Sequence, residues 1–267
     1  MNGALFTHTW RAYRVRLLIV TAALLVWGNI LPIIYDAFGE QFRDMMDSGL
    51  IPPQMAELGG GDIFSLTGSV ALGFVHPISV GLNLVFAVGF CAAAIAGERQ
   101  RGTLEILLSR PLSRRATYAT LALAGALFVA VVTAGYLGGA VMGSTITGRI
   151  DELGVSNLPL LWLNAFLLYA AFGAISLALS ASFDRLSPAL GISLAIVLVS
   201  YFLEVLGSLW PDAKGLQPYS LFHYLDPKAV LAGTAAPGDF VVLASVVAIG
   251  VVAALVIFPR RDLAAPS

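Results

Sequence analysis

Six long apolar stretches dominate the chain, each separated from the next by a segment richer in polar residues, glycine or proline. Each stretch is long enough to cross a bilayer as a helix, which takes about 20 residues. A membrane-spanning barrel would instead show alternating strands of about ten residues. The pattern predicts an all-α integral membrane protein, a single domain over residues 1–267 with six transmembrane helices. The predicted spans are about 17–38, 70–96, 116–142, 159–182, 187–209 and 239–258.

The composition of the chain also favours a membrane protein. Hydrophobic residues make up 58% of the sequence and charged residues only 12%, whereas soluble domains carry roughly a quarter of their residues as charge. The net charge of −1 provides no basic field that would attract nucleic acid. The single cysteine, Cys91, lies in an apolar run, so we expect it to be an unreactive packing residue.

The basic residues indicate the orientation of the spans. If the N-terminus is cytoplasmic, eleven of the 15 lysines and arginines fall in cytoplasmic segments and four in outer segments. Cytoplasmic loops of membrane proteins are enriched in these residues, so the split predicts a multi-pass protein of the cell (cytoplasmic or inner) membrane with both termini inside. In the outer segment 210–238, apolar and aromatic residues stand between prolines and glycines, which favours short re-entrant helices before the sixth span.

Glycines recur at every fourth position along the third predicted span, at Gly135, Gly139 and Gly143. Such a doubled GxxxG stripe allows two helices to approach closely. The pattern is typical of helix packing inside one subunit and also of an interface between two subunits. The sequence leaves both possibilities open.

The longest cytoplasmic connection, residues 97–115, reads GERQRGTLEILLSRPLSRR. Four of its apolar residues have the spacing i, i+3, i+4 and i+7, which is one face of a helix: Leu104, Leu107, Leu108 and Pro111. Thr103 is suited to capping a helix start, and Gly102 permits the turn before it. We therefore expect a cytoplasmic amphipathic helix between spans two and three. The alternative is a solvated loop whose arginines only enforce the topology.

This segment resembles the one that follows the second span in ABC-2 type permeases, the membrane-spanning subunits of one class of ATP-binding-cassette transporter. The pattern is an acid, three residues, Gly-Thr-Leu-Glu, one residue, Leu-Leu, two residues, Pro, an aliphatic residue and Ser-Arg. Eleven positions match it: Glu98, Gly102, Thr103, Leu104, Glu105, Leu107, Leu108, Pro111, Leu112, Ser113 and Arg114. The six spans and the inside termini extend the resemblance over the chain in outline. The chain departs from the pattern at one point: many relatives carry a lysine about seven residues after the Ser-Arg pair, where this chain has Leu121 and no lysine nearby.

The resemblance implies that the segment is a coupling helix, which docks on a nucleotide-binding ATPase subunit and transmits its ATP-driven closure. An apolar helix face suits a groove in a partner. Glu98, Arg101 and Glu105 supply charges for the partner's surface, although Arg101 and Glu105 are four residues apart and are also spaced to pair with each other.

The resemblance further implies a working unit of two permeases, identical or related, and two ATPase subunits. Substrate would pass between the permeases by alternating access, and an exporter of a hydrophobic or amphipathic compound is expected. The chain contains no G-x-x-x-x-G-K-[ST] phosphate loop. We therefore expect a transport subunit that is not itself an enzyme and binds no cofactor, with ATP and Mg held by the partner.

Three polar residues in or near the spans are candidates for a transport path. Glu204 is the only acid deep within a predicted span, and a charge at the bilayer centre costs on the order of 3 kcal/mol. An acid anchored at the interface or paired inside the protein is the alternative for Glu204. His76, before Pro77, and Asn83 are placed either to line a cavity or to stabilise a kink.

Two other function classes match part of the pattern. Tyr35-Asp36 and Gly59-Gly60-Gly61-Asp62 resemble the paired motifs of intramembrane aspartyl proteases, whose two aspartates share a proton, but Asp62 lies in a polar outer segment here. An ion-coupled secondary carrier would need charged residues near the midplane, often in two related halves, and the sequence shows no such halves. The three histidines are far apart in the sequence, so no metal site is predicted.

Overall fold

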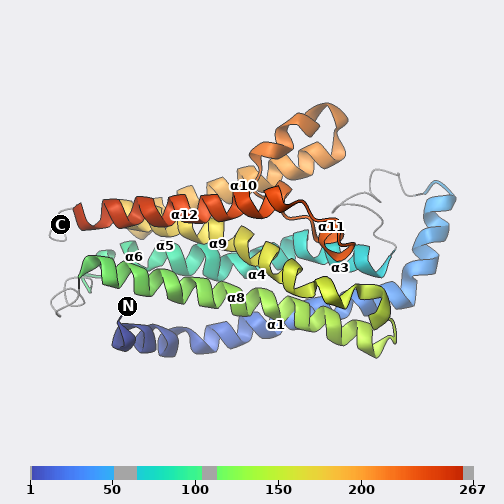
Figure 1. Cartoon of the computed structure of the whole chain (residues 1–267), viewed down its shortest axis with the longest axis horizontal. Helices are drawn as coiled ribbons and strands as arrows, with labels where there is room; N and C mark the ends of the chain where they lie inside the picture. Colours follow the sequence, from blue (N-terminus) through green and yellow to red (C-terminus); the bar gives the residue numbers. More distant parts are fainter. Residues whose placement is uncertain (1, 51–64, 104–112, 261–267) are drawn as a thin grey trace.

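The computed structural model describes residues 2–50, 65–103 and 113–260, which form a bundle of long helices lying side by side (Figure 1). Helix α1 begins and helix α12 ends at the same end of the bundle, here called the terminal end (Gly3 and Arg260). The other end, near Arg149 and Pro237, is called the opposite end. Between the described ends of the chain the structure contains no strand.

The elements differ widely in length. The long helices are α1 (Gly3–Asp47), α8 (Arg114–Ile146), α9 (Leu158–Ser182), α10 (Leu186–Leu209) and α12 (Pro237–Arg260). A broken helical run consists of α3 (Leu66–Val75), α4 (Pro77–Leu84), the π-helix η1 (Val85–Phe90), α5 (Cys91–Ala93) and α6 (Ala96–Gln100). The remaining short helices are η2 (Ile150–Leu153), η3 (Val155–Asn157), η4 (Pro211–Tyr219), η5 (Phe222–Tyr224) and α11 (Pro227–Leu231).

Five of the described helices are long and apolar enough to cross a membrane. A sixth span results if α3 and the run Pro77–Ala93, which are bent by 47° at the break between them, count as one. The predicted all-α architecture with six spans is confirmed in this form. The bend at Pro77 matches the kink that was one alternative for His76 and Asn83, whereas the π-helix and the break between α5 and α6 were not predicted.

Helix α1 extends beyond the predicted first span at both ends. Leu5 and Thr9, ahead of that span, and Leu17, at its start, are buried at intervals of four and eight residues, the spacing of one packed helix face. The apolar stretch that predicted the first span covers only the part of α1 in which both faces of the helix are apolar. Its first four turns bury one face and expose charged residues on the other, which a search for continuous hydrophobicity does not detect.

Helices α1 and α8 run side by side in the same direction (Figure 1). At the terminal end, the backbone N–H of Asn2 donates to Thr120 Oγ1 over 3.0 Å. At the opposite end, Arg149 Nε lies 2.8 Å from Asp36 Oδ1 in an ion pair. These two contacts fix the register of the pair along the full thickness of the bundle.

The glycine stripe of α8 forms the contact between these two helices. A Cβ atom on any of its three glycines would overlap α1. The α1 residues that it would meet are, in order along the stripe, Thr21, Leu25 and Asn29. The structure therefore uses the stripe for packing inside one subunit.

The break between α3 and α4 is stabilised by side chains of other helices. Pro77 has no N–H, so the carbonyl of Gly73, four residues earlier, lacks its usual helical donor. Trp27 Nε1 donates to that carbonyl over 3.2 Å. The hydroxyl of Tyr201 donates to the carbonyl of Val75, also over 3.2 Å. Both carbonyls are therefore satisfied inside the protein, as a break at membrane depth requires.

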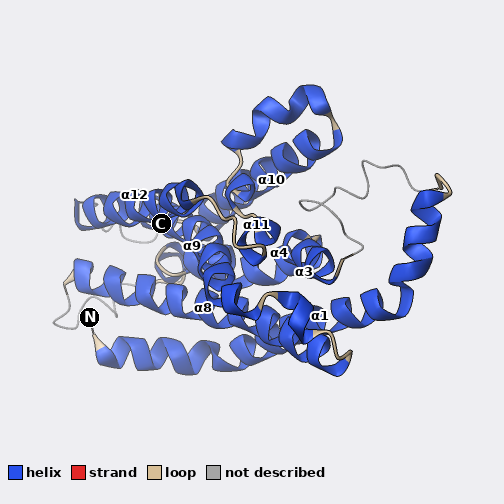
Figure 2. Cartoon of the chain, turned by 45° about the vertical axis from the view of Figure 1, so that its right-hand side comes forward, coloured by secondary structure: helices blue, strands red, loops and turns tan. Residues whose placement is uncertain are grey.

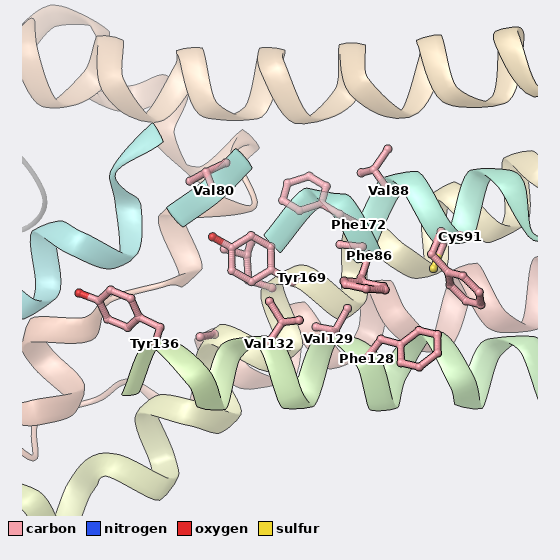
Figure 3. Close-up of a cluster of buried hydrophobic side chains, with 14 of the residues drawn as sticks. Val80, Phe86, Val88, Cys91, Phe128, Val129, Val132, Tyr136, Tyr169 and Phe172 are labelled. Atoms are coloured by element: carbon pink, nitrogen blue, oxygen red, sulfur yellow. The ribbon is translucent and has the colours of Figure 1, made fainter. Parts of the chain in front are cut away.

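The core between η1, α8 and α9 is rich in aromatic residues (Figure 3). Phe86 and Phe128 are fully buried with ring centroids 5.1 Å apart. Tyr136 is also fully buried, and its hydroxyl donates to the carbonyl of Val70 over 2.7 Å. Cys91 lies in the same core with 4% of its surface exposed, consistent with the expected packing role.

Between α10 and α12 the chain forms the short helices η4, η5 and α11, as predicted for the segment before the last span. Asn164 of α9 holds this segment, because its Nδ2 donates to the Tyr224 carbonyl over 2.9 Å. Phe222 is buried against Phe172, with ring centroids 5.4 Å apart. The segment therefore descends into the bundle, whereas the end of α10 and η4 project from it (Figure 2).

Candidate functional site

The residues predicted to couple the chain to a partner lie at two helix ends, both at the terminal end of the bundle. Those described are Glu98, Arg101, Gly102 and Thr103 after or within α6, and Ser113 and Arg114 at the start of α8. The others lie outside the described residues: Leu104, Glu105, Leu107, Leu108 and Pro111. The predicted amphipathic helix therefore stays a prediction, and the structure describes its two anchors.

Helix α6 ends in a Schellman motif built from the Gly-Thr pair of this segment. Gly102 has φ +71°, a conformation that glycine adopts without the strain of a Cβ atom. Its N–H donates to the Arg99 carbonyl (2.9 Å), and the Thr103 N–H donates to the Glu98 carbonyl (3.0 Å). The Thr103 hydroxyl also donates to Glu98 Oε2 (2.5 Å), and Arg101 pairs with the same carboxylate. Glu98 therefore stabilises the turn that leads into the segment.

The second anchor is the start of α8. The Ser113 side chain accepts a hydrogen bond from the Ala116 N–H over 3.2 Å, which caps the helix. Arg114 Nη1 donates to the carbonyl of Pro259 over 3.3 Å, so the start of α8 is tied to the end of α12. Ser113 and Arg114 thus position the point at which the chain re-enters the bundle.

The break between α5 and α6 is closed by a serine from α9. Ser180 is fully buried. Its hydroxyl donates to the Ala92 carbonyl over 2.7 Å and accepts from the N–H groups of Ala96 (2.9 Å) and Ile95 (3.1 Å). In a continuous helix the Ala96 N–H would donate directly to the Ala92 carbonyl. The serine hydroxyl is therefore inserted into the hydrogen-bond ladder of the second span.

Two further contacts join α6 to the turn between α9 and α10. Arg99 Nη1 lies 2.5 Å from Asp184 Oδ1 in an ion pair. Gln100 Oε1 accepts from the N–H of Leu186 over 2.9 Å, at the first turn of α10, where backbone N–H groups have no partner in their own helix. Together with Ser180, these contacts connect the end of span two to both neighbouring helices. This set of residues is called the α6 latch: Ser180, Arg99, Asp184 and Gln100.

Sequence reasoning missed the α6 latch. The side chain of Arg99 is only 8% exposed, and its Nε and Nη2 atoms find no hydrogen-bond partner. Burying charged donors without partners is costly, which makes this position sensitive to movement of the turn that carries Asp184. The sequence signal for the ion pair is a charge at the end of one span and an opposite charge in a very short turn between two others. No comparable signal distinguishes Ser180 from other serines in apolar helices.

Glu204 lies near the opposite end, where α10 packs against η4. Its side chain is 25% exposed. Gln217 Nε2 donates to Glu204 Oε1 over 3.0 Å, and His223 Nδ1 lies 3.8 Å from Oε2. Glu204 is therefore partnered inside the protein, which was one of the two alternatives for it. This contact joins α10 to the short helices before the last span.

The other two path candidates stabilise the kinked second span. His76 Nδ1 accepts from the N–H of Ile78 over 3.3 Å and so caps α4. Asn83 is 2% exposed, and its Nδ2 donates to the carbonyl of Ser79 over 2.9 Å. Among the described residues, no hydrogen bond or ion pair joins His76, Asn83 and Glu204. The structure thus does not assemble them into one site.

The paired-aspartate alternative gains no support from the described residues. Asp36 forms an ion pair with Arg149 on an exposed face, and Asp62 lies outside the described residues. Across the parts of the chain that the structure describes, no group of three or more His, Cys, Asp or Glu side chains is arranged to hold a metal ion.

The family model described as "ABC-2 family transporter protein" matches residues 11–263. No curated protein matches the chain. The family match covers all of the predicted spans and both anchors of the coupling segment.

Proposed function

The chain belongs to the ABC-2 family of transporter proteins and is a multi-pass transmembrane subunit of an ABC transporter; we propose that a separate ATPase drives it as an exporter. Two permeases, identical or related, and two ATPase subunits form the working unit. The ATPase subunits bind ATP and Mg, and this chain binds neither. Alternating access at the permease interface moves a hydrophobic or amphipathic substrate across the cell membrane, with both termini of the chain in the cytoplasm.

The α6 latch is the observation that carries this proposal. A partner that moves the coupling segment also moves the end of α6, because the segment begins at the Schellman turn after that helix. Ser180, Arg99 and Gln100 connect α6 to α9 and α10 by hydrogen bonds of 2.5–3.1 Å. Such contacts allow a displacement at the membrane surface to move three helices together, and hydrogen-bond networks between rigid helices are one physical carrier of coupling between distant sites.

Replacing Ser180 with alanine tests this role. Ser180→Ala removes the hydroxyl that joins α9 to the break in span two, so we expect ATP hydrolysis to continue with less transport. A coupling free energy of about 1 kcal/mol corresponds to a roughly fivefold lower ratio of transport to ATP hydrolysis. The measurement is that ratio for the reconstituted complex. The matched control is Ser176→Ala, one turn away on α9. Its buried hydroxyl donates to the Phe172 carbonyl of its own helix (2.7 Å) and, within the described parts of the chain, bonds to no other helix.

An unchanged ratio in Ser180→Ala would remove the latch from the coupling route. An equal fall in Ser176→Ala would show that any lost serine in α9 has the same effect, and would also argue against the latch. Either outcome leaves the family assignment untouched, because that assignment rests on the match over residues 11–263.

The proposed orientation is tested by cysteine labelling in intact cells. Ser48 is exposed at the opposite end, so Ser48→Cys should react with a membrane-impermeant reagent added outside. Ser109, in the coupling segment, should be shielded in Ser109→Cys until the membrane is permeabilised. The native Cys91 is buried and should contribute little background. Labelling of Ser109→Cys from outside would reverse the proposed orientation.

We also propose that Glu204 acts in transport through its position beside the short helices before the last span. Glu204→Gln keeps an acceptor for Gln217 and removes the charge, so assembly should be normal while transport and substrate-stimulated ATP hydrolysis change. Comparison of both rates with the wild type over a range of pH is the measurement. If the two proteins give superimposable profiles, Glu204 has only the structural role of joining α10 to η4.

A further inference from the structure

The first four turns of α1 lie beside apolar parts of the bundle. Tyr13 packs edge-on against Phe90 of η1, with ring centroids 4.9 Å apart, and Trp10 lies 5.9 Å from Phe128 of α8. Both phenylalanines are in the interior of predicted spans. The stretch of α1 that precedes its continuous apolar run is therefore held at the depth of the membrane rather than extending away from it.

Arg11 and Arg14 are three residues apart and share one outward face of this part of α1, whereas Arg16 lies on another side of the helix, next to Tyr13. Arg11, Arg14 and Arg16 are exposed, and among the described residues none of them lies within ion-pair distance of a carboxylate. Arg16 only approaches the ring of Tyr13, at 5.3 Å from its centroid. The exposed side chains around them include Val15 (60% exposed) and Leu18 (69%), together with the polar Thr7 and His8. The face thus combines unpaired positive charge with side chains suited to lipid.

A guanidinium at membrane depth requires water or an anion, because it never loses its proton. Arginine presents a planar set of donors that matches the oxygens of a phosphate group. Long arginine side chains reach from a helix toward the polar boundary of the bilayer. The phosphate of a lipid headgroup lies at that boundary, and its acyl chains fit the apolar residues between the arginines.

A second copy of this chain offers few acids for these arginines. The described acids at the terminal end are already paired, Glu98 with Arg101 and Asp184 with Arg99. The other described acids belong to the part of α1 beyond residue 35, to residues 151–152 or to residues 204–239, all toward the opposite end. Charge complementarity therefore favours lipid over a homodimer contact at this face.

We propose that the α1 face that carries Arg11 and Arg14 binds the headgroup phosphate of an anionic phospholipid. The acyl chains lie along the apolar residues of the same face. This inference depends on the membrane location of the chain and is independent of the ATPase partner. It adds a lipid-binding surface that keeps the N-terminal turns of α1 against α8.

Native mass spectrometry of the delipidated full chain in detergent tests the proposal. Phosphatidylglycerol and phosphatidylcholine are titrated separately into the wild type and the double variant R11Q/R14Q. Each arginine near an anionic surface contributes roughly a fivefold change in affinity, so the pair should lower phosphatidylglycerol affinity about 25-fold. Phosphatidylcholine binding should be unchanged. The charge-preserving variant R11K/R14K should retain most of the affinity, and thermal unfolding should confirm that each variant is folded.

The matched control is R115Q/R185Q, which removes two exposed arginines from the same end but not from α1. It should bind phosphatidylglycerol like the wild type. Equal losses in both double variants would mean that only net charge matters and would overturn the proposal. Full retention of phosphatidylglycerol by R11Q/R14Q would overturn it as well. So would displacement of the lipid by an equal concentration of inorganic phosphate, since a free anion would then be the preferred occupant.

Discussion

Replacing Leu107 with aspartate is expected to release the ATPase partner and abolish transport while membrane insertion stays normal. Leu107 belongs to the predicted apolar face of the coupling segment, and burying one leucine in a partner contributes roughly 1.5–3 kcal/mol. An aspartate at that position would in addition place a charge in an apolar groove. The measurement is co-purification of the ATPase with the tagged permease, together with transport in vesicles.

Glu105→Ala serves as the matched comparison within the same segment. A charge at the rim of an interface contributes about 1 kcal/mol or less, so this variant should retain the ATPase and lose only part of its transport. Should Leu107→Asp keep both the partner and transport at wild-type levels, the segment would be a solvated loop that sets topology. The proposed docking of an ATPase would then lose its main support.

Replacing Gly139 with alanine should destabilise the folded bundle, whereas the same change at Gly138 should not. A Cβ on Gly139 would overlap the Leu25 carbonyl and approach the Asn29 N–H to 2.9 Å, both backbone atoms of α1 that no rotamer change can move. Adding atoms to a filled contact costs about 1–3 kcal/mol. Gly138 has open space on its side of α8, so an alanine there should be neutral or slightly stabilising through helix propensity.

Thermal or denaturant unfolding of the purified chain in detergent measures this difference. Both variants exchange a glycine for an alanine at adjacent positions of the same helix, so the comparison isolates the contact with α1. Equal stability of the two variants would show that α1 and α8 are not closely packed in the protein. It would also reopen the possibility that the glycine stripe contacts a second subunit.

The two breaks in span two are bonded to neighbouring helices. At the first break, donors from α1 and α10 replace the missing helical bonds, and at the second, Ser180 of α9 does so. The Gly73, Val75 and Ala92 carbonyls and the Ile95 and Ala96 N–H groups are each bonded to a side chain of another helix. A span divided in this way can shift as separate pieces only if those helices shift with it. These hydrogen bonds link the end of span two, from which the predicted coupling segment begins, to several other helices, although span two is not one continuous helix.

The sequence alone determined the class of fold and the family, and it predicts where a coupling segment lies. Continuous apolar stretches predict spanning helices because the bilayer leaves backbone groups no partner other than their own helix. The motif from Glu98 to Arg114 indicates the family because its residues recur at fixed spacing. The turn at Gly102 was also readable, since glycine is the residue that adopts a positive φ without strain.

Only the tertiary structure decided which helices meet and what the isolated polar residues do. Ser180 looks like any serine in an apolar helix, and its insertion at the second break depends on α9 lying against α5 and α6. The sequence left the partner of Glu204 open, and the fold supplies Gln217, thirteen residues further along the chain. The glycine stripe was equally compatible with two interfaces until α1 occupied it. In each case the sequence shows that a residue is able to form a contact, and the packing of segments that are distant in sequence decides which partner it contacts.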